Sequence, residues 1–164
     1  MLFIALYAIN TTAKACFDDK KLEEQRVSGQ ASLIYIWSPR MVLSVTQAHL
    51  AAEQAAKYSR VPILNAGDGT NEHPTQGLLD MLTIRHEKKT LDGLNVVIVG
   101  DLKHTRSTNS LTLGLSNFDV NLTLVAPQGF ETSESILDVL RARKVKYTQA
   151  QDIRPAIKDA DVVY

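Results

Sequence analysis

Short apolar runs alternate with amphipathic stretches through most of this 164-residue chain. Apolar residues in a short continuous run predict a buried strand, and apolar residues at helical spacing predict a helix. The expected strands are Leu2–Ala8, Val61–Leu64, Asn95–Val99, Asn121–Val125, Val145–Tyr147 and Asp161–Tyr164, and Leu33–Trp37 is a further short apolar run. The expected helices are Val42–Tyr58, Pro74 to about Lys88, Thr105–Ser116, Ser133–Arg143 and Asp152–Lys158, while Thr11–Gln25 has weak helical character.

This alternation predicts an α/β fold in which parallel sheets are covered by helices on both faces. The turn at Leu91-Asp92-Gly93 lies within the most favourable stretch for a domain boundary, residues 88–93. We therefore expect one domain over residues 1–90 and a second over 91–164. The last apolar run, Asp161–Tyr164, has the character of an unfinished strand, which indicates a truncated chain or one that needs a partner.

Two polar loops each lead from a strand into a helix, and they carry the residues of chemical interest. His73 and Gln76 flank Pro74, which suits the first position of a helix expected to bury Leu78, Leu79 and Leu82. Arg106 occupies a similar place in the next strand–loop–helix unit. Helix N-termini favour anions, and ligands of parallel sheets bind at the carboxyl ends of the strands. The pattern therefore predicts a site for a small, doubly anionic substrate.

Each of these side chains has a functional and a structural interpretation. His73 suits a hydrogen-bond donor or a general acid or base, with a pKa lowered by the helix end, or it merely caps a loop. Gln76 offers both a donor and an acceptor to an amide or carbamoyl group, or it is a solvated glutamine. Arg106 suits a carboxylate or phosphate, or it is an ordinary surface arginine.

Composition and motifs exclude several classes of function. Apolar residues make up 45% of the chain, and 18 basic residues balance 18 acidic ones, which indicates a soluble globular protein without nucleic-acid or membrane binding. A single cysteine, Cys16, precludes an internal disulfide and fits a reducing cytoplasmic location. The glycine spacing after Gly100 does not match a dinucleotide-binding loop. Asp68 and Asp101 suit turn formation better than metal binding, and Lys103 and His104 suit a solvated loop better than a direct role.

Two segments resemble the aspartate carbamoyltransferase family. Asn65-Ala-Gly-Asp-Gly-Thr-Asn-Glu-His-Pro-Thr-Gln76 is similar to the family's His-Pro-Thr-Gln loop, and Val99-Gly-Asp-Leu-Lys-His-Thr-Arg106 is similar to the start of its aspartate domain. Threonine at position 75 favours the aspartate enzymes over their ornithine relatives, which usually carry cysteine there. The resemblance extends from about residue 48 to 164 and implies two Rossmann-like half domains.

The resemblance also implies an activity and a set of roles. His73 would polarise the carbonyl oxygen of carbamoyl phosphate, Gln76 would hold its amide, and Arg106 would bind a carboxylate of L-aspartate. Arg40 would contribute to substrate binding. No cofactor or metal is expected, and the implied assembly is a homotrimer.

The sequence departs from the family at the phosphate loop. Its nearest counterpart, Asn10–Ala13, contains no arginine, so we expect carbamoyl transfer by this chain alone to be impaired. The alternative is a non-catalytic relative that keeps the fold as a binding or interaction module.

Overall fold

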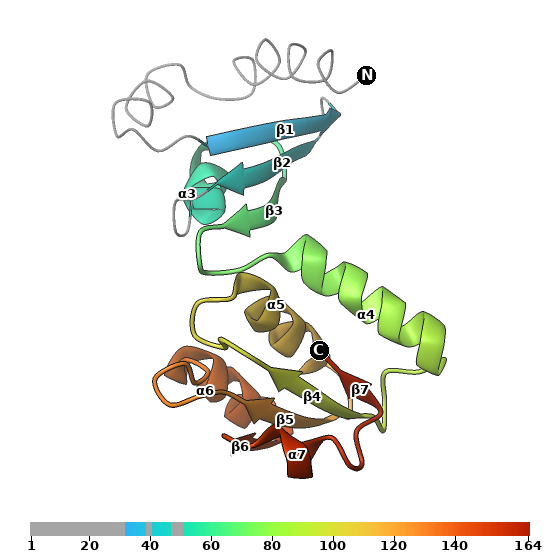
Figure 1. Ribbon diagram of the computed structural model, residues 1–164. Helices are drawn as coiled ribbons and strands as arrows, with labels where there is room; N and C mark the ends of the chain where they lie inside the picture. Colours follow the sequence, from blue (N-terminus) through green and yellow to red (C-terminus); the bar gives the residue numbers. More distant parts are fainter. Residues whose placement is uncertain (1–31, 39–40, 47–50) are drawn as a thin grey trace. The chain divides into compact units, whose positions relative to one another are not determined.

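The computed structural model describes residues 32–38, 41–46 and 51–164 (Figure 1). These described residues divide after Glu72 into two compact units. The expected elements Leu2–Ala8 and Thr11–Gln25, together with Arg40, lie outside the described residues. The first unit contains β1 (Ser32–Ser38), β2 (Met41–Thr46), α3 (Ala51–Tyr58) and β3 (Ile63–Asp68). Its sheet has the order β1-β2-β3.

The single helix expected over Val42–Tyr58 is wrong in its first part. Residues Met41–Thr46 form the central strand β2, which pairs with β1 antiparallel and with β3 parallel. Hydrogen bonds to a strand on each side stabilise the extended backbone of this segment more than its helical spacing of apolar residues favours a helix. Val42 and Val45 are also β-branched residues, which favour extended backbone. The helical part of the prediction persists as α3, and the β1–β2 pairing makes this sheet mixed instead of wholly parallel.

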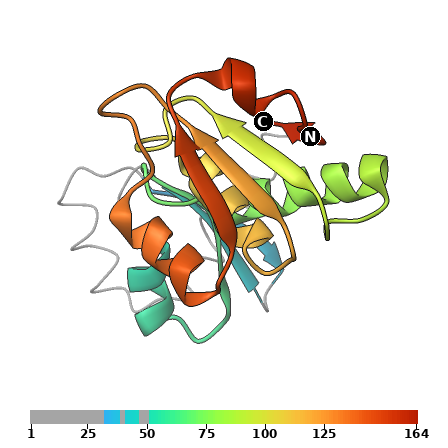
Figure 2. The ribbon, with the colours of Figure 1, turned by 90° about the horizontal axis from the view of Figure 1, so that it is seen from below.

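The second unit is a four-stranded parallel sheet with helices between its strands. After α4 (Pro74–Lys88), its elements are β4 (Asn95–Val99), α5 (Arg106–Leu115), β5 (Asn121–Val125), α6 (Glu134–Ala142), β6 (Lys146–Ala150), α7 (Ile153–Ala156) and β7 (Val162–Val163). The sheet order is β6-β5-β4-β7, and Figure 2 shows β4, β5 and β6 side by side. The predicted parallel sheet is therefore confirmed in this unit.

The core of the second unit is built from the central strands and the helices that cover them. Val96 and Ile98 of β4 and Leu122 and Leu124 of β5 are each at most 2% exposed. Leu111, Leu115 and Leu140, from α5 and α6, are fully buried in the same cluster. The near-continuous apolar character of β4 and β5 follows from burial of a parallel sheet on both faces.

Helix α4 packs against α5, with both helices running in the same direction. A Cβ atom added to Gly77 would lie 2.9 Å from the carbonyl carbon of Ser110, and one added to Gly114 would lie 2.8 Å from the sulfur of Met81. Gly77 thus pairs with Ser110, and Met81, one turn later on α4, pairs with Gly114, one turn later on α5. This order shows that the two helices run in the same direction. Glycine at these two positions allows the helices to approach closely. As a result, the N-termini of α4 and α5 lie at the same end of the pair.

This packing corrects the expected buried face of α4. Leu78, Leu79 and Leu82 are 63%, 55% and 63% exposed, whereas Gly77 and Ile84 are buried and Met81 packs against the core. Gly77 and Met81 contact α5, and Ile84 joins the core. The sequence alone offered no reason to expect a buried face that contains glycine in preference to one with three leucines. The division between the compact units, after Glu72, places α4 with the second unit.

Substitutions on α4 distinguish the two faces. We expect Ile84→Ala to lower the free energy of unfolding by about 2–4 kcal/mol, because it removes a buried side chain and leaves a cavity. Leu82→Ala, on the exposed face, should change it by about 0.5 kcal/mol or less. Chemical denaturation of both variants checks this, and a larger loss for Leu82→Ala would show that the leucine face is the packed one.

Candidate active site

The strand order of the second unit defines where a ligand belongs. Strand β4 lies between β5 and β7. The chain therefore passes from β4 to β5 on one side of β4 and later returns to form β7 on the other side of β4. Open parallel sheets bind ligands at such a switch point, beyond the carboxyl ends of the strands. Arg106 begins α5 directly after the loop that follows β4, and Tyr164 follows β7, with its carbonyl accepting a hydrogen bond from the Val99 amide. Both residues therefore lie at this edge.

His73 is the N-cap of α4, and its hydrogen bonds define its tautomer. Its Nδ1 atom accepts from the backbone N–H of Gln76 at 3.2 Å and lies 3.2 Å from the Thr75 hydroxyl oxygen. Because a backbone N–H can only donate, Nδ1 carries no proton, and the neutral ring carries its proton on Nε2. His73 therefore offers an N–H donor on the side of the ring away from the helix.

The backbone of His73 is tied to α5. Its N–H donates to the Ser110 hydroxyl at 2.8 Å, and Ser110 lies one turn after Arg106 on the same helix. The structure thus brings His73 and Arg106 together. Burial lowers the pKa of the His73 imidazole, and the Arg106 guanidinium lowers it further, although Asp80 opposes this effect. The neutral, donating form of His73 is therefore favoured at neutral pH.

Gln76 lies in the first turn of α4 and is held by a carboxylate that the sequence did not point to. Its Nε2 atom donates to Oδ1 of Asp80 at 2.8 Å, an i,i+4 contact on one helix face. Burial raises the pKa of the Tyr164 hydroxyl, and the Asp80 carboxylate contributes to the increase. The Gln–Asp spacing was visible in the sequence, whereas the participation of Ser110 and Tyr164 depends on tertiary packing.

The two helix N-termini together form an environment for an anion or a polarised carbonyl group. Neither α4 nor α5 has an acidic residue in its first turn, and the N-cap of α5, Thr105, makes no side-chain capping bond. The free N–H groups and helix dipoles thus meet at one edge with the Arg106 charge and the His73 donor. Such an arrangement can bind a carboxylate or phosphate and stabilise negative charge on an oxygen atom.

The remaining polar loop residues have structural roles. Asp68 is 1% exposed and accepts hydrogen bonds from the Glu72 amide and the Asn71 side chain, which confirms its interpretation as a turn former. Asp101 likewise accepts from the amides of Lys103 and His104. Lys103 and His104 are exposed, as expected of a solvated loop. Within the described residues, no three potential metal ligands cluster together, and no helix there is long and apolar enough to cross a membrane.

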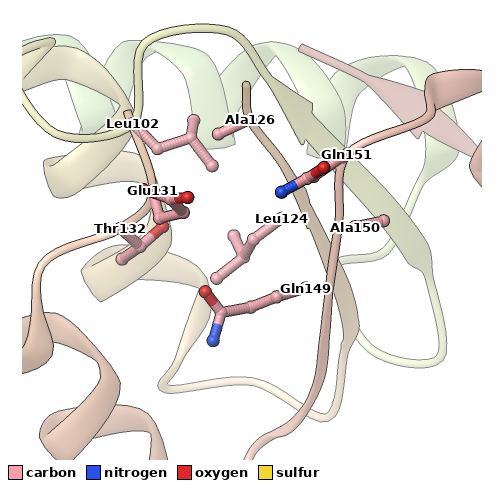
Figure 3. A pocket seen from close by; sticks show the side chains of 8 residues that line it. All are labelled: Leu102, Leu124, Ala126, Glu131, Thr132, Gln149, Ala150 and Gln151. Carbon is pink, nitrogen blue, oxygen red and sulfur yellow. The ribbon is translucent and has the colours of Figure 1, made fainter. Parts of the chain in front are cut away.

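A separate cavity of about 230 Å³ lies at the carboxyl ends of β5 and β6 (Figure 3). Its lining combines apolar side chains such as Leu124 with exposed polar ones, including Gln149, Gln151 and Glu131. The Glu131 carboxylate already accepts a hydrogen bond from the Gly129 amide. His73, Gln76 and Arg106 do not line this cavity, so it is separate from the candidate site.

The electrostatic contact between His73 and Arg106 has a measurable consequence. We expect His73 to titrate below its ordinary pKa of 6.5, and Arg106→Gln to raise that pKa. Because the unfolded chain binds the proton more readily, this group makes stability rise with pH between the folded and unfolded pKa values. Proton NMR titration checks the shift, with Lys103→Gln as the charge-matched control. A His73 pKa that is unchanged by Arg106→Gln would contradict the proximity of the two side chains.

Comparison with known proteins places both units in one family. Residues 20–86 match the model of the aspartate/ornithine carbamoyltransferase carbamoyl-P binding domain, and residues 92–164 match that of the Asp/Orn binding domain. The first match ends within the last turn of α4 and the second begins at residue 92, whereas the compact units divide before α4.

Individual relatives agree with these domain matches. The aspartate carbamoyltransferase catalytic subunit of Methanococcoides burtonii is 46% identical over 114 residues, which are 70% of this chain and 37% of that protein. The structure of the Methanocaldococcus jannaschii catalytic subunit of aspartate transcarbamoylase has a TM-score of 0.66 at 38% identity, covering 76% of this chain and 41% of that one.

The Trypanosoma cruzi aspartate transcarbamoylase in complex with carbamoyl phosphate and aspartate has a TM-score of 0.67 at 34% identity. That match covers 72% of this chain and 39% of the other. The chain thus spans less than half the length of the relatives it matches. With two domain matches and structural neighbours of the same kind, the chain belongs to the aspartate/ornithine carbamoyltransferase family.

Proposed function

We propose that this chain acts in carbamoyl transfer from carbamoyl phosphate to L-aspartate, a step of pyrimidine biosynthesis. The observation that carries the proposal is the convergence of the His73 donor, the Gln76 amide and the Arg106 guanidinium at two adjacent helix N-termini. The Trypanosoma cruzi relative is a complex with both substrates, which supports this choice of ligands.

The geometry suits each step of this reaction. The Nε2–H of His73 would donate to the carbonyl oxygen, which becomes negative as the aspartate amine attacks the carbamoyl carbon. Gln76 would hold the carbamoyl amide, and Arg106 would bind a carboxylate of L-aspartate. The carbonyl then re-forms as the bond between the carbamoyl carbon and the phosphate oxygen breaks, and the departing phosphate takes the proton that the aspartate amine loses, with no cofactor needed.

We further propose that the 164-residue chain alone is a poor catalyst. Among the described residues, Arg106 is the cation whose charge acts on His73. Arg106 cannot both bind a substrate carboxylate and stabilise the leaving phosphate, and the nearest counterpart of the family's phosphate loop, Asn10–Ala13, contains no arginine. We include in the proposal the trimer that the resemblance implies, for which light scattering should give three times the mass of one chain.

Replacement of His73 tests the proposal. We expect isothermal titration to detect carbamoyl phosphate binding by the chain and to show its loss in His73→Ala. Any carbamoyl-aspartate formation should fall by about 10²–10³-fold in that variant, because one donor to the developing oxyanion is removed. His104→Ala, an exposed histidine in the nearby loop, is the matched control and should behave as the unmodified chain.

Two results would count against parts of the proposal. Binding that is unaffected by His73→Ala would favour a non-catalytic carbamoyltransferase-like module. Rapid turnover by the unmodified chain that disappears in His73→Ala would support the site but contradict the expected impairment.

A further inference from the structure

Asp80 is a carboxylate without an assigned role, and it lies beside the candidate site. It is on α4, one turn after Gln76, and its Oδ1 atom accepts from Gln76 Nε2 at 2.8 Å. Its Oδ2 atom is buried and makes no hydrogen bond of ordinary geometry among the described residues, although the Tyr164 hydroxyl interacts with this carboxylate. A carboxylate that is partly withdrawn from water is costly unless neighbouring polar groups compensate its charge, so the groups around Asp80 determine what it does.

The charge of Asp80 acts on the other groups at this edge of the sheet. It raises the pKa of His73, in opposition to burial and to Arg106. Burial raises the pKa of the Tyr164 hydroxyl, and Asp80 adds to that effect. Asp80, His73, Arg106 and Tyr164 are therefore one electrostatic cluster within the second unit, and Gln76 is its uncharged member.

The contact determines which end of the Gln76 carboxamide is available. An ionised carboxylate only accepts hydrogen bonds, so Nε2 of Gln76 faces Asp80 and Oε1 is directed away from it. Next to it, His73 offers the Nε2–H donor. The site thus combines one acceptor and one donor, which complement the N–H and C=O groups of a carbamoyl group. An acetyl group has the carbonyl oxygen but no N–H.

We infer that Asp80 is a positioning residue that selects carbamoyl over acyl substrates by fixing the orientation of the Gln76 carboxamide. The inference rests on the proposed function, because it assumes that the carbamoyl group lies between His73 and Gln76. Asp80 itself touches Gln76 and not the substrate. Its removal should therefore alter discrimination between ligands without removing the cation or the His73 donor.

The test compares two ligands that differ only at the selected group. Acetyl phosphate carries a methyl group where carbamoyl phosphate carries its amide nitrogen. In Asp80→Asn, the new amide can donate to Gln76 Oε1, which allows the carboxamide to turn and present its N–H groups instead. We expect carbamoyl phosphate to bind about tenfold more weakly, the effect of one lost hydrogen bond, and acetyl phosphate binding to stay within about twofold.

Three further variants make the measurement specific. Gln76→Ala should lose the same discrimination, and Asp80→Asn should add nothing in the Gln76→Ala background, because the two side chains act as one unit. Glu87→Gln removes a carboxylate from an exposed position of the same helix and should leave both affinities unchanged. An equal loss of affinity for both ligands in Asp80→Asn would overturn the inference.

A second readout separates this inference from the proposed function. The Gln76 side-chain NH₂ resonances in a ¹⁵N correlation spectrum report the Asp80 contact without any ligand. We expect Asp80→Asn to shift them and Glu87→Gln to leave them in place. If the chain binds neither ligand, the proposed function fails, and resonances that are insensitive to Asp80→Asn would independently overturn the orientation.

Discussion

The close, same-direction packing of α4 on α5 is the constraint on which the candidate site depends. Glycine at positions 77 and 114 removes the side chains that would hold the helices apart, and the two contact points follow each other by one turn on both helices. Packed in opposite directions, the same helices would place one N-terminus at each end. The observed direction instead brings two sets of free N–H groups to the carboxyl edge of β4.

The chemistry of the site follows from two opposite charges at this edge of the sheet, those of Arg106 and Asp80. Arg106 favours the neutral form of His73, and the capping bond to Nδ1 directs its proton to Nε2. Asp80 counters the positive charge and engages the nitrogen of Gln76. Arg106, Asp80 and the N-termini of α4 and α5 thereby determine which atoms of two neutral side chains donate and which accept. These side chains are His73 and Gln76. This is the kind of preorganised polarity that stabilises charge developing on a carbonyl oxygen.

The sequence predicted those features that depend on local patterns. The parallel sheet of the second unit, the start of α4 at Pro74 and the placement of Arg106 after β4 followed from periodicity and turn chemistry. The buried face of α4 did not, because its contact with α5 uses glycine where three leucines formed a more hydrophobic stripe. Strand β2 was missed because strand partners on both sides outweigh helical spacing. Asp80 was overlooked because its importance comes from its interactions with His73 and Tyr164, which tertiary packing creates and a single sequence does not reveal.

The protonation of the His73 ring is the most direct measure of this account. Long-range ¹H–¹⁵N correlation NMR of the neutral imidazole distinguishes a proton on Nε2 from one on Nδ1. The capping bond from the Gln76 amide predicts the Nε2–H tautomer, with Nδ1 unprotonated. A predominant Nδ1–H tautomer at neutral pH would contradict the cap, leave no donor on the outer side of the ring, and invalidate the role given to His73.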